Sequence, residues 1–269
     1  MGLVKGRKIL SFIFTVFFVA GMLMLFGTFI ADNTICRSAY TSKFILSSSI
    51  KAELDGNYER RITALSKQCG IPADVFLTSK EDFAEDDNVS NRFFRGYETT
   101  IYSKEKVETV KNYCKEYLSA SDISYTEAEV DSIAEMAVRI YDESYGLRHT
   151  QEAYEYVEWI HSVSNKIYSS ALIFIFLSMI GMAVLYSKKV EFQKALMSQF
   201  NATGFTFVAV SLSCLIARIG THANVTPSVY STALANAVRA DFILLLIIGL
   251  VFTALSVYFT PKVFSKVSK

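Results

Sequence analysis

Residues 9–30 read ILSFIFTVFFVAGMLMLFGTFI, a run of 22 residues that contains no charged side chain. An α-helix rises about 1.5 Å per residue, so a run of this length crosses a hydrocarbon core of about 30 Å. Lys5, Arg7 and Lys8 precede the run and favour a cytoplasmic N-terminus. A cleaved signal peptide is the alternative, but the run is long for one and no A-x-A cleavage pattern follows it. We therefore predict an uncleaved membrane anchor.

Three further apolar segments lie in the C-terminal part of the chain, at 168–186, 203–219 and 242–259. The segment 203–219 is the weakest, because it carries several Ser, Thr and Cys side chains and includes Arg218 near its end. Basic residues mark the N-terminal tail, the 187–198 loop and the C-terminal tail, which share one side of the membrane if four helices alternate. The sequence therefore predicts a multi-pass plasma-membrane protein with both termini cytoplasmic and residues 31–167 extracellular.

The charge distribution supports this division of the chain. From Asp32 to Lys166 there are 16 basic and 24 acidic residues, a net charge of −8. The rest of the chain holds 11 basic residues and only two acidic ones, Glu191 and Asp241. An acidic insert beside a basic remainder is what one large external domain on a membrane protein should produce.

The 31–167 segment shows helical periodicity throughout and no strand pattern. We predict six amphipathic helices, with stops at Asp55-Gly56 and Gly70 and a capping box formed by Thr126 and Glu129. The stripes that define the middle helices include Phe93, Phe94, Tyr97 and Ile101. From about Thr150 to Tyr186 no breaker occurs, which predicts one long helix that couples the insert rigidly to the second span. About 135 residues in six helices suffice to bury a core of their own.

These features define the predicted fold class, an all-α membrane protein with four transmembrane helices. Residues 1–30 form the cytoplasmic tail and first span, residues 31–167 an external helical domain, and residues 168–269 the other three spans. A short surface helix is expected after Thr226-Pro227, because Pro favours the first position of a helix.

The phrases QCGIPADVF at 68–76 and ISYTEAEVDSIAEMAVRIY at 123–141 resemble uncharacterised four-span integral membrane proteins of Gram-positive bacteria. The resemblance covers most of the chain and rests on packing and capping patterns. It implies a bacterial plasma membrane and brings no activity with it.

Two residue pairs are candidates for specific structural roles. Cys69 and Cys114 lie on the apolar faces of two predicted helices, where they could form a disulfide or remain two buried free thiols. Arg218 and Asp241 lie at the outer ends of neighbouring spans, where an ion pair would hold the third and fourth helices together. A substrate or proton site at this pair is the alternative interpretation.

No pattern of catalytic or metal-binding residues stands out. Glu155, Glu158 and His161 share a helix without an H-E-x-x-H motif, and the acidic cluster 81–88 lacks the alternating ligands of an EF-hand. There is no Ser-His-Asp pattern and no phosphate-binding Gly loop. We therefore predict no catalytic residue, no metal and no cofactor, and weigh only as a minor alternative an enzyme that uses His222 with Asp241.

The leading functional hypothesis is a non-enzymatic membrane protein whose external helical domain binds another membrane protein or an extracellular ligand. The alternative is a subunit or accessory component of a transporter or channel, in which the Ser-rich third span lines a path. The lipid bilayer is the expected partner in both cases, and no nucleic acid is expected to bind.

Overall fold

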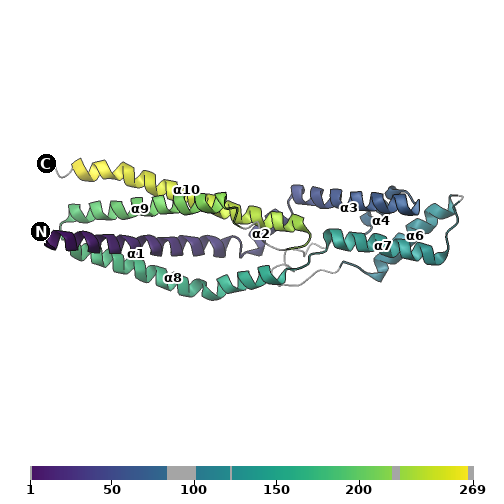
Figure 1. Ribbon diagram of the computed structural model, residues 1–269, viewed down its shortest axis with the longest axis horizontal. Helices are drawn as coiled ribbons and strands as arrows, with labels where there is room; N and C mark the ends of the chain where they lie inside the picture. The colour runs from purple at the N-terminus through teal and green to yellow at the C-terminus, as the bar shows by residue number, and fades with distance from the viewer. Residues whose placement is uncertain (1, 84–100, 122, 220–224, 266–269) are drawn as a thin grey trace. The chain divides into compact units, whose positions relative to one another are not determined.

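The computed structural model describes residues 2–83, 101–121, 123–219 and 225–265, and within these ranges every regular element is a helix (Figure 1). The chain divides into two compact units. We call Met1–Tyr40, Tyr156–Thr221 and Ala235–Lys269 the bundle, and Thr41–Glu155 with His222–Leu234 the insert unit. The predicted all-α class is confirmed for the described residues.

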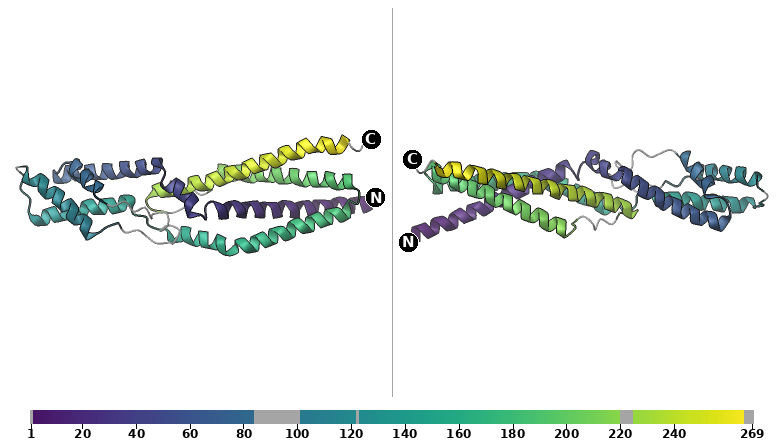
Figure 2. Two further views of the ribbon diagram at one scale, coloured as in Figure 1. Left: turned by 180° about the vertical axis from the view of Figure 1, so that it is seen from behind. Right: turned by 90° about the horizontal axis from the view of Figure 1, so that it is seen from above.

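Four long helices supply the bundle: α1 (Gly2–Asn33), α8 (Gln151–Leu185), α9 (Lys189–Ile216) and α10 (Ser228–Ser265). They run lengthwise beside one another (Figure 2), and α1 packs closely on α9. Each contains a segment of 28 to 35 residues that is long and apolar enough to cross a membrane, and the hydropathy is lowest in α9, at 1.4. Four such helices fit a multi-pass membrane protein in contact with the lipid bilayer, as predicted.

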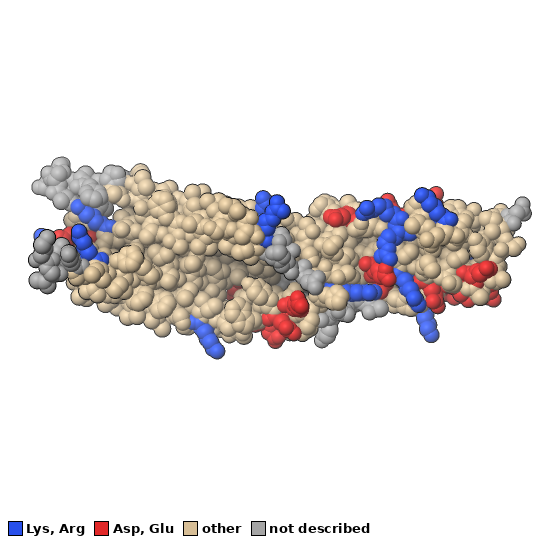
Figure 3. Space-filling view, viewed as in Figure 1, with Lys and Arg blue, Asp and Glu red and all other residues tan. Residues whose placement is uncertain are grey.

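The sides of the long helices are largely uncharged, whereas charged side chains of both signs gather over the insert unit (Figure 3). Large apolar side chains lie exposed along the bundle helices, among them Phe12, Phe176, Ile180, Leu250 and Val257. In water such a surface would be unstable, but in a bilayer it faces lipid tails of the same polarity.

The centre of the bundle combines aromatic packing with close helix approach. Phe18 and Phe207 are buried there, and both contact neighbouring phenylalanine rings edge-on. A Cβ atom built at Gly204 would lie 2.8 Å from the carbonyl oxygen of Gly249, and one at Gly249 would lie 2.9 Å from that of Gly204. Only glycine permits this approach of α9 to α10, which is typical of membrane helix pairs.

The insert unit is built from α3 (Ser48–Cys69), α4 (Ala73–Glu81), α6 (Lys104–Ser119) and α7 (Glu127–Tyr145), while α2 (Ser38–Ile45) lies between α1 and α3 in the chain. Helix α3 packs on α4 and α7, and α6 packs on α4 and α7 (Figure 1). The unit has its own buried apolar core, formed by Tyr58, Ile62, Leu65, Cys69, Ile71, Phe76, Phe83, Val110, Cys114, Val130, Ala134, Ala137, Val138 and Tyr141.

Local signals in the sequence account for several helix ends. Thr126 and Glu129 form the predicted capping box at the start of α7. Gly70 ends α3 with a φ of +70°, a left-handed conformation that glycine adopts without a steric penalty. The long helix predicted from about Thr150 to Tyr186 is confirmed as α8.

Two predicted boundaries are wrong. Helix α3 continues through Asp55-Gly56, because its apolar stripe runs on and the burial of Leu54 and Tyr58 outweighs the cost of about 1 kcal/mol for one internal glycine. The helix after Pro227 is not short but continues into the fourth span as α10. The stripe at Phe93, Phe94 and Tyr97 lies outside the described residues.

Candidate functional site

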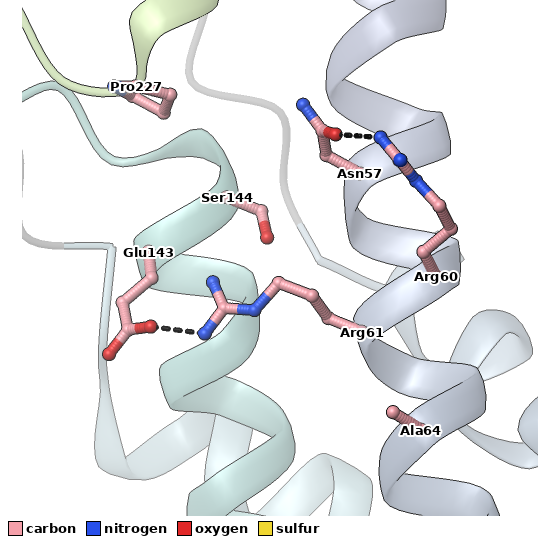
Figure 4. Close-up of a pocket in the computed structure, with 7 residues that line it drawn as sticks. All are labelled: Asn57, Arg60, Arg61, Ala64, Glu143, Ser144 and Pro227. Carbon is pink, nitrogen blue, oxygen red and sulfur yellow. Dashed lines mark hydrogen bonds and ion pairs between the residues drawn. The ribbon is translucent and has the colours of Figure 1, made fainter.

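A groove of about 430 Å³ lies between α3 and α7 in the insert unit (Figure 4). Four of its lining residues come from α3, two from α7 and one from the segment before α10: Asn57, Arg60, Arg61, Ala64, Glu143, Ser144 and Pro227. Pro227 is held there because Thr226 and Arg148 pair through two backbone hydrogen bonds of 2.8 and 3.1 Å. The groove is therefore lined by three segments that are far apart in the sequence.

The charges around this groove are unequal. The guanidinium of Arg61 pairs with the carboxylate of Glu143, and that of Arg60 donates to the side-chain oxygen of Asn57 and to the Gly56 carbonyl oxygen at 3.2 Å. Two guanidinium groups and one carboxylate leave one positive charge in excess. Arginine presents several N–H groups in a planar fork that suits carboxylate and phosphate groups, so the groove has the chemistry to bind an acidic group.

Ser144 adds a buried polar atom to the same groove. The residue is only 4% exposed, and its Oγ has no hydrogen-bond partner among the residues that the structure describes. The side chain points into the space between α7 and α3, on the side of Arg61 (Figure 4). A buried hydroxyl without a partner costs about 1–3 kcal/mol, so a ligand oxygen that pairs with it would gain affinity.

The position of α7 against α3 is fixed by a second cluster, formed by Asp55, Lys80 and Tyr145. The Lys80 ammonium lies 2.7 Å from Asp55 Oδ1 and 2.6 Å from the Tyr145 hydroxyl, which donates to Asp55 Oδ1 at 2.5 Å. Burial opposes the ionisation of Asp55, but the hydrogen bonds from Lys80 and Tyr145 outweigh it and lower the pKa of this carboxyl group. The cluster joins α3, α4 and α7 and thus holds the groove walls in place.

Asp142 holds the C-terminal end of α7, the end that also carries Tyr145. Its carboxylate is buried, at 5% exposure, and accepts from the backbone N–H groups of Ile101 and Tyr102 at 2.5 and 3.2 Å. The guanidinium of Arg148 forms an ion pair with Asp142 Oδ2 at 2.6 Å. Every partner is charged or a backbone donor, so this buried acid is satisfied within the chain and has a structural role.

The bundle contains a buried acid of a different kind. Asp241 is 7% exposed, and its Oδ2 lies 2.7 Å from the Thr34 hydroxyl oxygen. The Tyr40 hydroxyl also donates a hydrogen bond to the Asp241 carboxylate. Its Oδ1 has no partner in the described part of the chain. Arg218 is exposed in the turn after α9, where it has a φ of +51°. The ion pair between Arg218 and Asp241 stays a prediction.

Cys69 and Cys114 lie in the same core cluster of the insert unit, and both are free thiols in this structure. Burial, with a further contribution from Cys69, raises the pKa of the Cys114 thiol to about 12. The mutual influence places the two side chains close together, as the sequence predicts, and the disulfide itself stays a prediction.

Within the described residues no group of three or more His, Cys, Asp or Glu side chains is placed to hold a metal ion. His161 pairs with Asp32 at 3.0 Å in the bundle rather than with the glutamates on its own helix. His222 and the 84–88 part of the acidic cluster lie outside the described residues, so the interpretations that use them stay untested.

The chain matches no family model, no curated protein and no solved structure.

Sequence reasoning missed the groove. The adjacent Arg60-Arg61 pair on a helix was the available signal, because it places two guanidinium groups on neighbouring parts of one surface. Ser144 gave no signal, since a serine near a helix end usually bonds to the backbone of its own helix.

Proposed function

We propose that the protein is a non-enzymatic, plasma-membrane binding protein whose insert unit takes an acidic group of a partner or ligand in the α3–α7 groove, outside the membrane. The observation that carries the proposal is the conjunction of two arginines with the buried, unpaired hydroxyl of Ser144. The arginine guanidinium groups would fix the position of an acidic group. An oxygen of that group that forms a hydrogen bond with the buried Ser144 hydroxyl would add to the affinity.

The proposed topology keeps both termini in the cytoplasm and residues 31–167 outside. The basic residues of the two tails and of the 187–198 loop favour this orientation. Arg7 pairs with Glu191 at 2.6 Å, so the N-terminal segment and the start of α9 lie at the same end of the bundle. A bacterial membrane is the setting that the resemblance implies.

The test uses the full chain in its native membrane. A photo-crosslinking amino acid replaces Ala64, which lines the groove, or Met136, which is exposed on α7 and lines no part of it. We expect a light-dependent adduct at position 64 and none at 136, and loss of the adduct when Arg60 and Arg61 are both changed to Ala. Equal adducts at both positions, or an adduct that survives the double change, would refute the proposal.

A second candidate function, a component of a transporter or channel, is favoured by the buried polar side chains of α9. Gln199, Thr203 and Ser211 are fully buried in the bundle. The Gln199 amide donates to the Ser178 hydroxyl at 2.8 Å, while its Oε1 has no partner within the described ranges. Polar atoms of this kind in a membrane bundle are costly and can line a path for solutes.

Solute or ion flux into liposomes separates the two candidates. A transporter component should give flux above that of empty liposomes, and the flux should fall in a variant that carries both Arg218→Ala and Asp241→Ala. Flux at background level in the wild type and the variant alike would remove this second candidate.

A further inference from the structure

A further cavity lies within the bundle, at the end where α1 and α9 begin and α8 ends (Figure 1). Its volume is about 260 Å³, and we call it the bundle pocket. All three helices contribute to its walls. The polar side chains among the lining residues are Ser11 and Thr15 of α1, Tyr186 directly after α8, and Glu191, Lys194 and Ser198 of α9.

The bundle pocket is closed on the side that faces the centre of the bundle. One turn further along the same three helices, the Gln199 amide donates to the Ser178 hydroxyl at 2.8 Å, and this hydroxyl donates to the carbonyl oxygen of Phe14 at 2.6 Å. Met182 lies on α8 between this network and Tyr186 and is 1% exposed. A ligand therefore reaches the pocket from the end of the bundle and not through its centre.

The walls of the bundle pocket can donate several hydrogen bonds. The Ser11 hydroxyl donates to the Met182 sulfur at 3.7 Å, and a thioether is a weak acceptor. An anionic oxygen would take this hydrogen in place of the sulfur, because charge-assisted hydrogen bonds are stronger. The ammonium of Lys194 has three N–H groups, and the exposed Ser198 adds a hydroxyl. Donors of this kind match a group that is rich in acceptor oxygens, such as a phosphate.

The charge at this end of the bundle is positive. Glu191 is paired with Arg7 at 2.6 Å, and the same guanidinium lies over the Tyr186 ring at 4.4 Å from its centroid. The other acidic side chains of the bundle lie toward its opposite end: Asp32, Glu158 and Asp241. The basic side chains at the pocket end are Arg7, Lys8, Lys188, Lys189 and Lys194. One acidic side chain leaves positive charge in excess there, whichever of the basic groups it pairs with.

The bundle pocket lies at the level at which the apolar runs begin. Ser11 is the third residue of the uncharged run 9–30, and Tyr186 is the last residue of the apolar segment 168–186. Lipid headgroups lie at this boundary of the hydrocarbon core. Phe12 on α1 and Val184 on α8 are exposed apolar side chains at the same level, so acyl chains can lie beside the pocket.

We propose that the bundle pocket binds the phosphate group of an anionic phospholipid, with the Lys194 ammonium and the Ser11 hydroxyl as its principal donors. Basic pockets between membrane helices bind lipid headgroups of this class. The positive charge supplies the attraction, the hydroxyl groups supply hydrogen bonds, and the exposed apolar flanks of α1 and α8 distinguish a lipid from a free phosphate. This inference is independent of the α3–α7 groove and of its ligand.

The test uses the full chain in vesicles of phosphatidylcholine and phosphatidylglycerol in equal amounts. The protein is extracted in detergent, and native mass spectrometry counts the lipids that stay bound to it. We expect the wild type to retain phosphatidylglycerol in preference to phosphatidylcholine. Lys194→Gln should lower the retained phosphatidylglycerol by about tenfold, because it removes a charge-assisted hydrogen bond. Ser11→Ala changes no charge and should lower it as well.

Lys189→Gln is the matched control, because it removes the same charge from an exposed residue of α9 that does not line the pocket. It should retain as much phosphatidylglycerol as the wild type. Equal losses in Lys194→Gln and Lys189→Gln would overturn the proposal, since they would show a diffuse attraction to the basic end. Equal retention of both lipids would also overturn it. So would displacement of the lipid by soluble glycerol phosphate, which would assign the pocket to a free phosphate compound.

Discussion

The replacement of Ile62 by Ala tests whether the insert unit has a self-sufficient core. Ile62 is 0% exposed and lies on α3 within the apolar cluster that α4, α6 and α7 complete. The change removes three carbon atoms, which costs about 2.4 kcal/mol at about 0.8 kcal/mol for each. The cavity left behind adds to this loss, so we expect a total of about 3.5 kcal/mol, within the range for such changes.

Hydrogen exchange followed by mass spectrometry on the full chain can measure this loss for each helix separately. A destabilisation of about 3.5 kcal/mol should raise exchange in α3 and α7 peptides by about 300-fold, since every 1.4 kcal/mol is a factor of ten. Peptides from α1 and α9 serve as an internal reference and should not change.

Met136→Ala is the matched control, because this α7 side chain is 45% exposed and its loss should change stability by no more than about 0.5 kcal/mol. The reasoning is refuted if the two variants exchange alike, or if Ile62→Ala raises exchange in α1 and α9 as much as in α3.

Four further outcomes are expected. The pKa of Asp55 is lowered in the folded state, so its ionisation stabilises the insert unit at neutral pH. This stabilisation should be lost in acid as the pH falls through the lowered pKa. Asp55→Asn should therefore make the unfolding midpoint less dependent on pH. Thr126→Ala removes the capping box and should cost about 1 kcal/mol, seen as faster exchange confined to the first turn of α7, whereas an unchanged turn would contradict the capping role. Gly249→Ala should lower the unfolding midpoint of the bundle by separating α9 from α10, at a cost of about 1–3 kcal/mol, and a wild-type midpoint would show that the helices do not meet there. Cys69 and Cys114 should resist alkylation until the chain is denatured; if they need a reductant as well, they form the predicted disulfide.

Part of this fold was open to prediction because its signals are local. The capping box at Thr126 and the glycine at position 70 each act within one or two turns, and each apolar run lies within one continuous segment. All three appear in the structure as expected. Gly56 misled the prediction, since the penalty of one glycine is small beside an apolar stripe that continues on both sides of it.

The candidate sites depend on long-range contacts that no local sequence pattern indicates. Ser144 and Arg61 are 83 positions apart and meet only because α3 packs on α7. Thr34 and Asp241 are separated by 207 positions and come into contact only in the folded bundle. The sequence singles out Asp241 and predicts Arg218 as its partner, an ion pair that stays a prediction, whereas no local pattern indicates the contact with Thr34.

The Gly204–Gly249 contact has a consequence for how the bundle can move. Because each backbone nearly touches the other at one level, α9 and α10 can neither slide past nor approach each other there without a clash. A rotation of one helix relative to the other would therefore pivot at this level. Spectroscopic labels placed on the two helices above and below it would then report distance changes of opposite sign, one end closing as the other opens.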